Sequence, residues 1–219
     1  MSFKKNKYTI IRKAVSKELA TFVANYFSIK KQVYDTCVKH RYISPFENML
    51  GFYETKNEQV PDTFCTYSDI AIETLMLKCQ PKMEEATGLK LYPAYTYGRL
   101  YKKGDELKRH KDRFSCEIST TMNLGGDPWP IYLSPKENVG AIDGKNITNS
   151  SNAKGVKVDL KPGDMLVYRG VELEHWREKF KGTECVQVFL HYNNSKTPGA
   201  EDNIYDTRPH LGLPSWFRK

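Results

Sequence analysis

Two short segments constrain the fold of this chain most, because together they can place three metal ligands on neighbouring strands. The first covers residues 110–112 and reads His-Lys-Asp; the second, residues 174–177, contains a further histidine. On an extended strand, residues i and i+2 point to the same side, with Cβ atoms ~6.5–7 Å apart. His110 and Asp112 can therefore converge on one ion, and His175 on an adjacent strand would complete the set.

Strand and turn signals surround both segments. Residues 95–101 alternate aromatic and β-prone side chains, and a Lys-Gly-Asp turn at 103–105 separates them from the strand that carries the first two ligands. Before the second segment, a Pro-Gly turn at 162–163 precedes an apolar run at 165–168 that is short enough for a buried strand. Three ligands on one face leave the opposite positions open, as in non-heme Fe(II) oxygenases.

The two stretches form the string R-x-Y-x-x-G-x-x-x-x-x-H-x-D, followed by L-x-P-G-D-x-L-x-Y and a distal histidine. This string closely resembles the prolyl 4-hydroxylase-like family of 2-oxoglutarate/Fe(II) dioxygenases, over roughly residues 8 to 192. The resemblance implies a double-stranded β-helix (jelly-roll) core and His110, Asp112 and His175 as iron ligands. It also implies 2-oxoglutarate and O2 as co-substrates, with ascorbate as a candidate addition, and hydroxylation of an unactivated C–H bond.

Three hypotheses follow for the function. The first is a 2-oxoglutarate- and Fe(II)-dependent dioxygenase that acts on a peptidyl proline. The second is the same chemistry on a free amino acid, a small metabolite or a modified nucleobase. The third is a non-catalytic, cupin-like binding protein with the same three ligands. An aspartate at position 112 favours hydroxylation over halogenation, because in related enzymes a small residue at this position would leave a site open for a halide ion. The substrate and the oligomeric state stay open at this point.

The distal carboxylate of 2-oxoglutarate needs a cation in a dry site. The family usually places a Lys or Arg nine or ten residues after the distal histidine, but those positions here are Glu184 and Cys185. Arg177 is the nearest substitute, because on a continuing strand it shares the face of His175. Two alternatives are that Arg177 is a surface or ion-paired residue, with Glu174 as its partner, or that Lys179 or Lys181 takes the role.

The same carboxylate also needs a hydroxyl donor. Tyr101 stands where the resembling family places that donor, and Thr121 near the end of the next strand is a further candidate. Both residue types also commonly just pack in strands. His40, His191 and His210 are interpreted as structural histidines.

Composition favours one intracellular domain. A length of 219 residues allows a substantial hydrophobic core without disulfides or structural metals to stabilise it. The five cysteines form an odd set without C-x-x-C spacing, which indicates reduced thiols rather than disulfides or a zinc site. No apolar run reaches the ~18–20 residues of a membrane span, and the first residues lack the apolar core of a signal peptide. We therefore expect a cytoplasmic protein.

The expected fold class is α+β, mainly β, with N-terminal helices that flank a jelly roll. Residues 1–88 would form the helical layer and first strands, 89–193 the jelly-roll core and 194–219 the tail. One helix should run from its N-cap Ser16 to about Lys39, with Phe22 on its apolar stripe. A second should run from about Asp69 to Thr87, with Ser68 as cap, Ile70 on the buried face and a kink or break near Gln80 caused by Pro81. Trp216 and Phe217 would anchor the tail.

Further strands are expected at 8–15, 116–124, 131–134, 156–160, 165–169 and 184–192, with a short one near 49–53. The irregular stretch 43–66 and the Gly/Asn/Ser-rich loop 136–155 would border an open substrate groove.

The net charge of +8 admits an anionic partner, nucleic acid included. Basic residues crowd the segment of the first two ligands and could steer 2-oxoglutarate or an anionic substrate, or could simply be solvated; they are Lys102, Lys103, Lys108, Arg109, Lys111 and Arg113. No recognition helix strengthens the nucleic-acid hypothesis.

Overall fold

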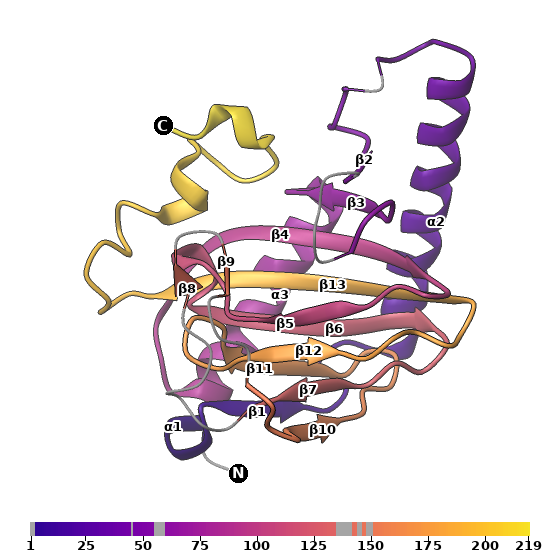
Figure 1. Cartoon of the computed structure of the whole chain (residues 1–219). Helices are drawn as coiled ribbons and strands as arrows, with labels where there is room; N and C mark the ends of the chain where they lie inside the picture. The colour runs from indigo at the N-terminus through magenta and orange to yellow at the C-terminus, as the bar shows by residue number, and fades with distance from the viewer. Residues whose placement is uncertain (1–2, 45, 55–59, 135–141, 144–145, 148–150) are drawn as a thin grey trace.

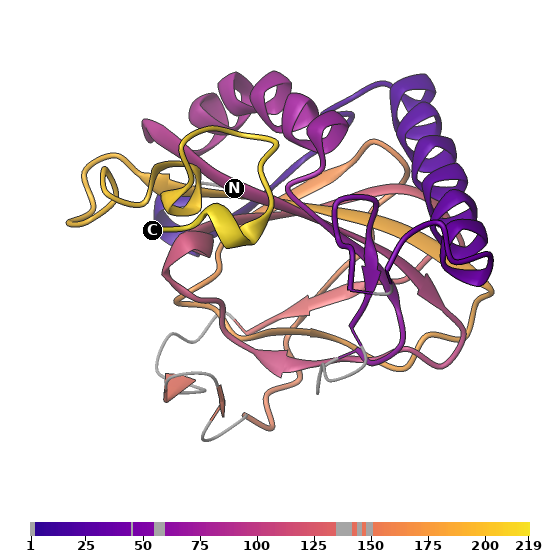
Figure 2. The same cartoon turned by 90° about the horizontal axis from the view of Figure 1, so that it is seen from above.

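The computed structural model describes residues 3–44, 46–54, 60–134, 142–143, 146–147 and 151–219. Its centre is a pair of antiparallel sheets with seven and four strands, flanked on one side by two long helices (Figures 1 and 2). This architecture confirms the predicted jelly roll with N-terminal helices. Two further short strands, β8 (Ile142–Asp143) and β9 (Asn146–Ile147), pair with each other apart from both sheets.

The larger sheet contains the long strands of the fold. Its spatial order is β1 (Tyr8–Ile11), β11 (Met165–Arg169), β6 (Ile118–Gly126), β13 (Glu184–Asn194), β4 (Leu91–Lys102), β3 (Phe64–Tyr67) and β2 (Phe52–Tyr53). Strand β2 lies within the short strand expected near 49–53, whereas β3 covers the end of the stretch 43–66 that was predicted to be irregular. A pairing of β3 with β4 stabilises them there, and this non-local contact is not visible in the local sequence.

The smaller sheet carries the metal-ligand segments. Its order is β10 (Val156–Val158), β7 (Ile131–Leu133), β12 (His175–Arg177) and β5 (Leu107–His110). Strands that lie far apart in the sequence are therefore neighbours here, and His175 stands directly opposite His110 in the register of β12 and β5.

Two helices cover the outer face of the larger sheet: α2 (Lys17–Lys39) and α3 (Ile70–Thr87) (Figure 2). A one-turn helix, α1 (Phe3–Asn6), precedes them. Ser16 caps α2 as predicted, since its side chain accepts a hydrogen bond from the Leu19 N–H. Phe22 was expected on the buried stripe but is 68% exposed, because the face that packs on the sheet is centred on Val23 and Phe27.

The start of α3 differs from the prediction. Asp69, not Ser68, is the N-cap, and its carboxylate accepts hydrogen bonds from the Ala71 and Ile72 N–H groups. Ser68 has a positive φ of 52°, which turns its side chain out of capping position. The helix thus begins one residue later, and Ile70 in its first turn is 70% exposed instead of buried.

The break that was expected near Pro81 does not form. Helix α3 continues through it to Thr87 and ends at Gly88, which adopts the left-handed conformation with φ 71°. Proline removes one helical N–H, here the one that would pair with the carbonyl of Leu77. Leu77 and Pro81 lie on the exposed face of the helix, where water can satisfy that carbonyl.

The C-terminal tail is held by charged residues rather than by its aromatic end. Trp216 and Phe217 are 54% and 46% exposed, so their predicted anchoring role is wrong. Arg208 instead donates to the Glu73 carboxylate at 2.9 Å and to the Ala94 carbonyl at 3.0 Å. A buried hydrogen-bonded pair positions the tail more specifically than two apolar rings could.

Asp206 makes the second attachment of the tail. It accepts two hydrogen bonds from Arg113, at 2.7 and 2.8 Å, and one each from Ser115 and Tyr67, both at 2.6 Å. Asp206 lies among three consecutive residues with φ between 56° and 64°. These bonds offset the strain that such positive φ values impose on non-glycine residues.

All five cysteines are free. Within the described residues, no helix is both long and apolar enough to cross a membrane. Most of the predicted loop 136–155 lies outside the described residues.

Candidate functional site

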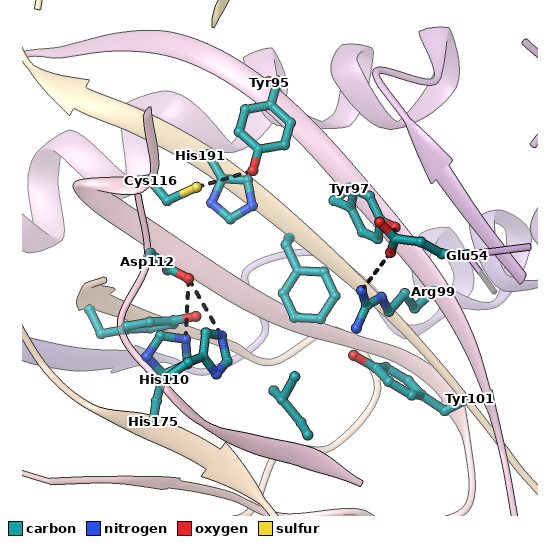
Figure 3. Close-up of a pocket in the computed structure, with 13 residues that line it drawn as sticks. Glu54, Tyr95, Tyr97, Arg99, Tyr101, His110, Asp112, Cys116, His175 and His191 are labelled. Carbon is teal, nitrogen blue, oxygen red and sulfur yellow. Dashed lines mark hydrogen bonds and ion pairs between the residues drawn. The ribbon is translucent and has the colours of Figure 1, made fainter. Parts of the chain in front are cut away.

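One cavity opens between the two sheets and contains both ligand segments. It encloses ≈ 630 Å³ of space free of atoms, part of which is open to solvent. Strands β4 and β13 supply one wall, and β5, β12 and the segment after β5 supply the other (Figure 3). The predicted ligands His110, Asp112 and His175 all line it, as does Tyr101.

The three predicted ligands converge in this cavity. Asp112 Oδ1 lies 3.4 Å from His175 Nε2 and 3.6 Å from His110 Nε2. Asp112 was expected on the same strand as His110. This expectation is wrong, because β5 ends at His110 and the chain then turns. Its main-chain N–H donates to the Gly170 carbonyl at 2.9 Å, which returns the carboxylate to the cavity.

The hydrogen-bond partners of His110 and His175 show which ring nitrogen of each side chain carries a proton. Nδ1 of His110 lies 2.8 Å from the Lys108 carbonyl, and Nδ1 of His175 lies 3.0 Å from the Leu173 carbonyl. A carbonyl only accepts, so each Nδ1 carries a proton, and Nε2 is the ring nitrogen left on each histidine to bind a metal. This is the tautomer that a metal ligand needs.

Protonation favours the same role. Burial, with the nearby His175, lowers the pKa of His110 to about 4, so its imidazole is neutral near pH 7. Burial alone would raise the pKa of Asp112, but the charge and hydrogen bond of His175 hold it well below its usual range. Burial alone would lower the pKa of His175, but the charge and hydrogen bond of Asp112 raise it, so a bound metal would take the place of the proton that the two residues share. A neutral imidazole and a carboxylate are the forms that bind a divalent ion.

A glycine and a serine support Asp112 from behind. The Ser119 hydroxyl donates to Asp112 Oδ2 at 2.8 Å. A Cβ on Gly170 would collide with the same oxygen, so only glycine allows this approach. The sequence reasoning singled out neither residue, because neither belongs to the ligand motif.

Beside Tyr101, which lines the end of the cavity away from the triad, the structure brings together the three residues proposed for the co-substrate, although Arg177 and Thr121 are not among the described residues that line the cavity. Arg177 donates to Thr121 Oγ1 at 3.0 Å, to Gln187 Oε1 at 3.3 Å and to the Trp129 carbonyl. The Tyr101 ring packs on Trp129 at 4.7 Å, and the Arg177 guanidinium lies 5.1 Å from the same ring. Glu174 pairs with Arg109, not with Arg177, so the alternative ion pair does not form.

Several polar atoms at this end have no protein partner. Among the described residues, the Tyr101 hydroxyl and the Nε groups of Arg99 and Arg177 are buried without a hydrogen bond. Burial raises the pKa of Tyr101, although Arg99 and Arg177 act against it, so the phenol stays protonated as a donor. Unpaired buried donors beside two guanidinium groups form a site for an anion.

Arg177 is buried without a counter-charge. It is 1% exposed, and in the described part of the chain only neutral oxygens accept its hydrogen bonds. Burial lowers the pKa of its guanidinium, although Cys185, Tyr101 and Tyr168 oppose that shift. A buried charge of this kind needs an opposite charge nearby.

Sequence reasoning missed His191, Cys116 and Arg99 as cavity residues. His191 had been interpreted as structural, yet its Nδ1 lies 3.0 Å from Ser119 Oγ, the hydroxyl that also holds Asp112. With Asp112 and Cys116, it forms a second group whose ligand atoms lie within 4.8 Å of one another. The period-2 alternation of the predicted strand 184–192 would have placed His191 on the face of Phe189.

The predicted basic rim does not reach this cavity. None of the basic residues between 102 and 113 is among the described residues that line it. Lys102 pairs with Asp105, Arg109 with Glu174 and Arg113 with Asp206. The cation at the cavity wall is Arg99, which belongs to the preceding strand.

No family model matches the chain, and no curated protein matches it. Solved structures do. A Pseudomonas putida prolyl-4-hydroxylase matches at 13% identity and TM-score 0.51, covering 88% of this chain and 95% of that one. HygX from Streptomyces hygroscopicus, solved with nickel and 2-oxoglutarate, matches at 12% identity and TM-score 0.55, with 99% and 91% coverage.

A third similar structure is the epimerase SnoN in complex with Fe3+, alpha ketoglutarate and nogalamycin RO. It matches at 10% identity and TM-score 0.62, covering 88% of this chain and 81% of that chain. At such identities, the likeness establishes a shared fold, and it confirms the jelly roll.

Proposed function

We propose that this protein is a 2-oxoglutarate- and Fe(II)-dependent oxygenase that hydroxylates a C–H bond. The observation that carries the proposal is one cavity with two complementary ends. The His-Asp-His triad lies at one end, and Tyr101 lines the other end beside the buried Arg177, which donates to neutral oxygens. A metal ion bound to the triad and a 2-oxoglutarate dianion bound near Arg177 would together provide the ligands that both ends lack.

The metal end fits a divalent first-row ion. His110, Asp112 and His175 would hold it through two nitrogens and one oxygen, the donor set of facial Fe(II) sites with open positions. When bound, Fe(II) and 2-oxoglutarate react with O2 to supply the oxidising power for C–H hydroxylation, releasing succinate and CO2. The protein would orient both groups and exclude water.

The far end fits the distal carboxylate of 2-oxoglutarate. Arg177 would neutralise that carboxylate, and Tyr101 would donate its unused hydroxyl proton. Thr121 holds the Arg177 guanidinium at 3.0 Å and so orients it. An arginine on the strand of the distal histidine would thereby replace the usual cation, whose positions are Glu184 and Cys185 here.

The similar structures support this proposal, since HygX and SnoN were each solved with a metal and 2-oxoglutarate (alpha ketoglutarate). We also propose that residues 1–219 form one domain in a reducing, cytoplasmic setting, supported by five free thiols. The substrate would be a small molecule or a peptide. Ascorbate stays a candidate addition, and none of the described residues that line the cavity favours nucleic acid.

Succinate formation tests the proposal. The purified protein would be incubated with Fe(II), 2-oxoglutarate and O2, and compared with an Asp112→Ala variant. Anaerobic absorption of the Fe(II)–2-oxoglutarate complex would be recorded in parallel. We expect both the absorption and succinate from the parent protein. A complex that forms the absorption but gives no succinate with any substrate panel would instead support the cupin-like binder.

A further inference from the structure

The cavity has a third surface that neither the metal end nor the arginine end uses. It consists of Tyr95 and Tyr97 on β4 and Phe189 and His191 on β13, which we call the aromatic wall. The two strands are paired so that His191 stands opposite Tyr95 and Phe189 opposite Tyr97. Because alternate residues of a strand share a face, all four side chains line the cavity, and Figure 3 shows Tyr95, Tyr97 and His191 among them.

The rings of this wall are arranged for stacking. The centroids of Tyr95 and His191 lie 4.6 Å apart with planes at 32°, and His191 and Phe189 are nearly parallel at 6°. Tyr67 extends the row behind Tyr95, at 5.0 Å and 26°. Tyr97 and Phe189 are only half-buried, so aromatic surface is left uncovered inside the cavity. Such a surface gains free energy when another ring covers it.

The formal charges beside the wall are already paired. The Arg113 guanidinium lies 4.5 Å from the Tyr95 ring centroid and is bonded to the Asp206 carboxylate at 2.7 and 2.8 Å. The Arg99 guanidinium lies 5.0 Å from the Tyr97 centroid and pairs with Glu54 at 3.3 Å. A substrate carboxylate or ammonium would have to break one of these pairs, whereas an uncharged ring would leave both intact.

The wall adjoins the metal end. A ring nitrogen of His191 and the Cys116 sulfur lie within 4.8 Å of an Asp112 oxygen. A ring that packs on His191 and Phe189 would therefore present its edge C–H bonds toward the triad, while the space toward Tyr101 stays free for the co-substrate. Proximity of the reacting groups is what such a site must provide.

We propose that the aromatic wall is the subsite of the prime substrate, and that it binds an uncharged ring that carries the C–H bond to be hydroxylated. The inference rests on the proposed oxygenase function. It selects among the open substrates: a neutral ring of a small molecule, or a proline ring within a peptide, fits the wall. A free amino acid or a small acyclic acid does not, because its charges would compete with the Arg113–Asp206 and Arg99–Glu54 pairs, and the unpaired donors beside Tyr101 would be occupied by the co-substrate.

Ring-dependent turnover tests the inference. Phe189→Leu removes a ring from the wall, Phe189→Tyr retains it, and Phe22→Leu on the exposed face of α2 serves as a matched control. The probes are N-acetylprolinamide, a proline-containing peptide, free proline, thymidine and thymidine monophosphate. We expect at least one neutral ring to stimulate 2-oxoglutarate decarboxylation tenfold or more above its charged counterpart.

The variants should separate binding of the ring from binding of the co-substrate. Phe189→Leu should raise the KM of that ring about tenfold and leave the 2-oxoglutarate requirement unchanged, whereas Phe189→Tyr and Phe22→Leu should resemble the parent protein. Stimulation by charged probes alone, or an unchanged KM in Phe189→Leu, would overturn the inference. Failure to form the anaerobic Fe(II)–2-oxoglutarate absorption would overturn the proposed function instead.

Discussion

Arg177 and Arg208 are both almost fully buried, at 1% and 3% exposure, yet they are held in opposite ways. Arg208 pairs with the Glu73 carboxylate at 2.9 Å and ties the C-terminal tail to α3. Among the residues that the structure describes, Arg177 donates only to neutral oxygens, including those of Thr121 and Gln187. A paired buried charge stabilises one arrangement of the chain, whereas an unpaired one is costly unless a ligand completes it.

This difference in pairing indicates that Arg208 has a structural role and Arg177 a ligand-binding role. Burial lowers the pKa of Arg177, which indicates that its surroundings disfavour the cation. It also predicts opposite responses to mutation: loss of Arg208 should cost stability, and loss of Arg177 should cost ligand binding. The following experiments test that division.

The largest expected effect is on turnover. Asp112→Ala should abolish succinate formation, because it removes the only anionic ligand of the triad and leaves two neutral imidazoles. The thermal midpoint of the protein should change little by comparison. Asp159→Ala, at an exposed aspartate that is not among the described residues lining the cavity, is the control and should retain activity. Undiminished turnover in Asp112→Ala would remove the triad from the mechanism.

Next in size is the stability effect of the structural arginine. Arg208→Met leaves the Glu73 carboxylate buried without its partner, and we expect a loss of about 3–5 kcal/mol in the free energy of unfolding. Urea denaturation measures it. In a Glu73→Gln/Arg208→Met double variant, much of the loss should be recovered. Arg177→Met should change the stability of the ligand-free protein far less. An equal loss of stability in Arg208→Met and Arg177→Met would show that the two arginines do not differ in role.

The stability of the protein should also depend on pH through the buried His191. Burial lowers the pKa of His191 to about 4; Asp112 and Asp206 oppose this shift, and Arg113 and His175 add to it. The unfolded chain, with a pKa near 6.5, binds more protons between these values, so stability should fall as the pH drops from about 6.5 to 4. The contribution is roughly 3 kcal/mol.

Urea denaturation of the metal-free protein at pH 7.5 and pH 4 would measure this effect. His191→Asn should lose less stability on acidification than the parent, whereas the exposed His210 changed to Asn should behave like the parent. Equal losses in all three would show that His191 is not held neutral by its surroundings.

The smallest expected effect concerns the functional arginine. Arg177→Ala should raise the 2-oxoglutarate requirement by ten- to a hundredfold, or about 1.4–2.7 kcal/mol. Titration of 2-oxoglutarate against succinate yield measures it, with Lys196→Ala, an exposed lysine after β13, as the control. An unchanged requirement would move the role to Lys179, to His191 or to Arg99, the other buried guanidinium beside Tyr101.

The parts of the site that the sequence could predict are those with a short-range signature. The His-x-Asp spacing and the strand signals around it were enough to single out three side chains that the structure brings within reach of one ion. Arg177 followed from the two-residue period of a strand. Its contact with Thr121 could not be predicted, since β6 and β12 lie in different sheets.

The missed residues have no local signature. His191 faces the cavity because β13 pairs with β4 in one register, and a shift by one residue would turn it away. Cys116 had been placed in a strand, but it ends a short 3-10 turn, Phe114–Cys116, that follows the ligand loop. The choice between Ser68 and Asp69 as cap likewise depended on the backbone conformation, which the residue types alone do not determine.

By itself, the sequence determined which chemical groups are available and which local elements form, because strand period, turn residues and ligand spacing act within a few positions. The tertiary structure decided which charges are paired. The strand period singled out Arg177, but the residues around Arg208 and Arg177 do not show which charge is paired. Only the packing of α3 against the tail supplies Glu73 to Arg208, and only the jelly roll buries Arg177 beside an unused tyrosine hydroxyl. Pairing depends on distances between residues remote in the chain, and those distances exist only once the sheets have closed.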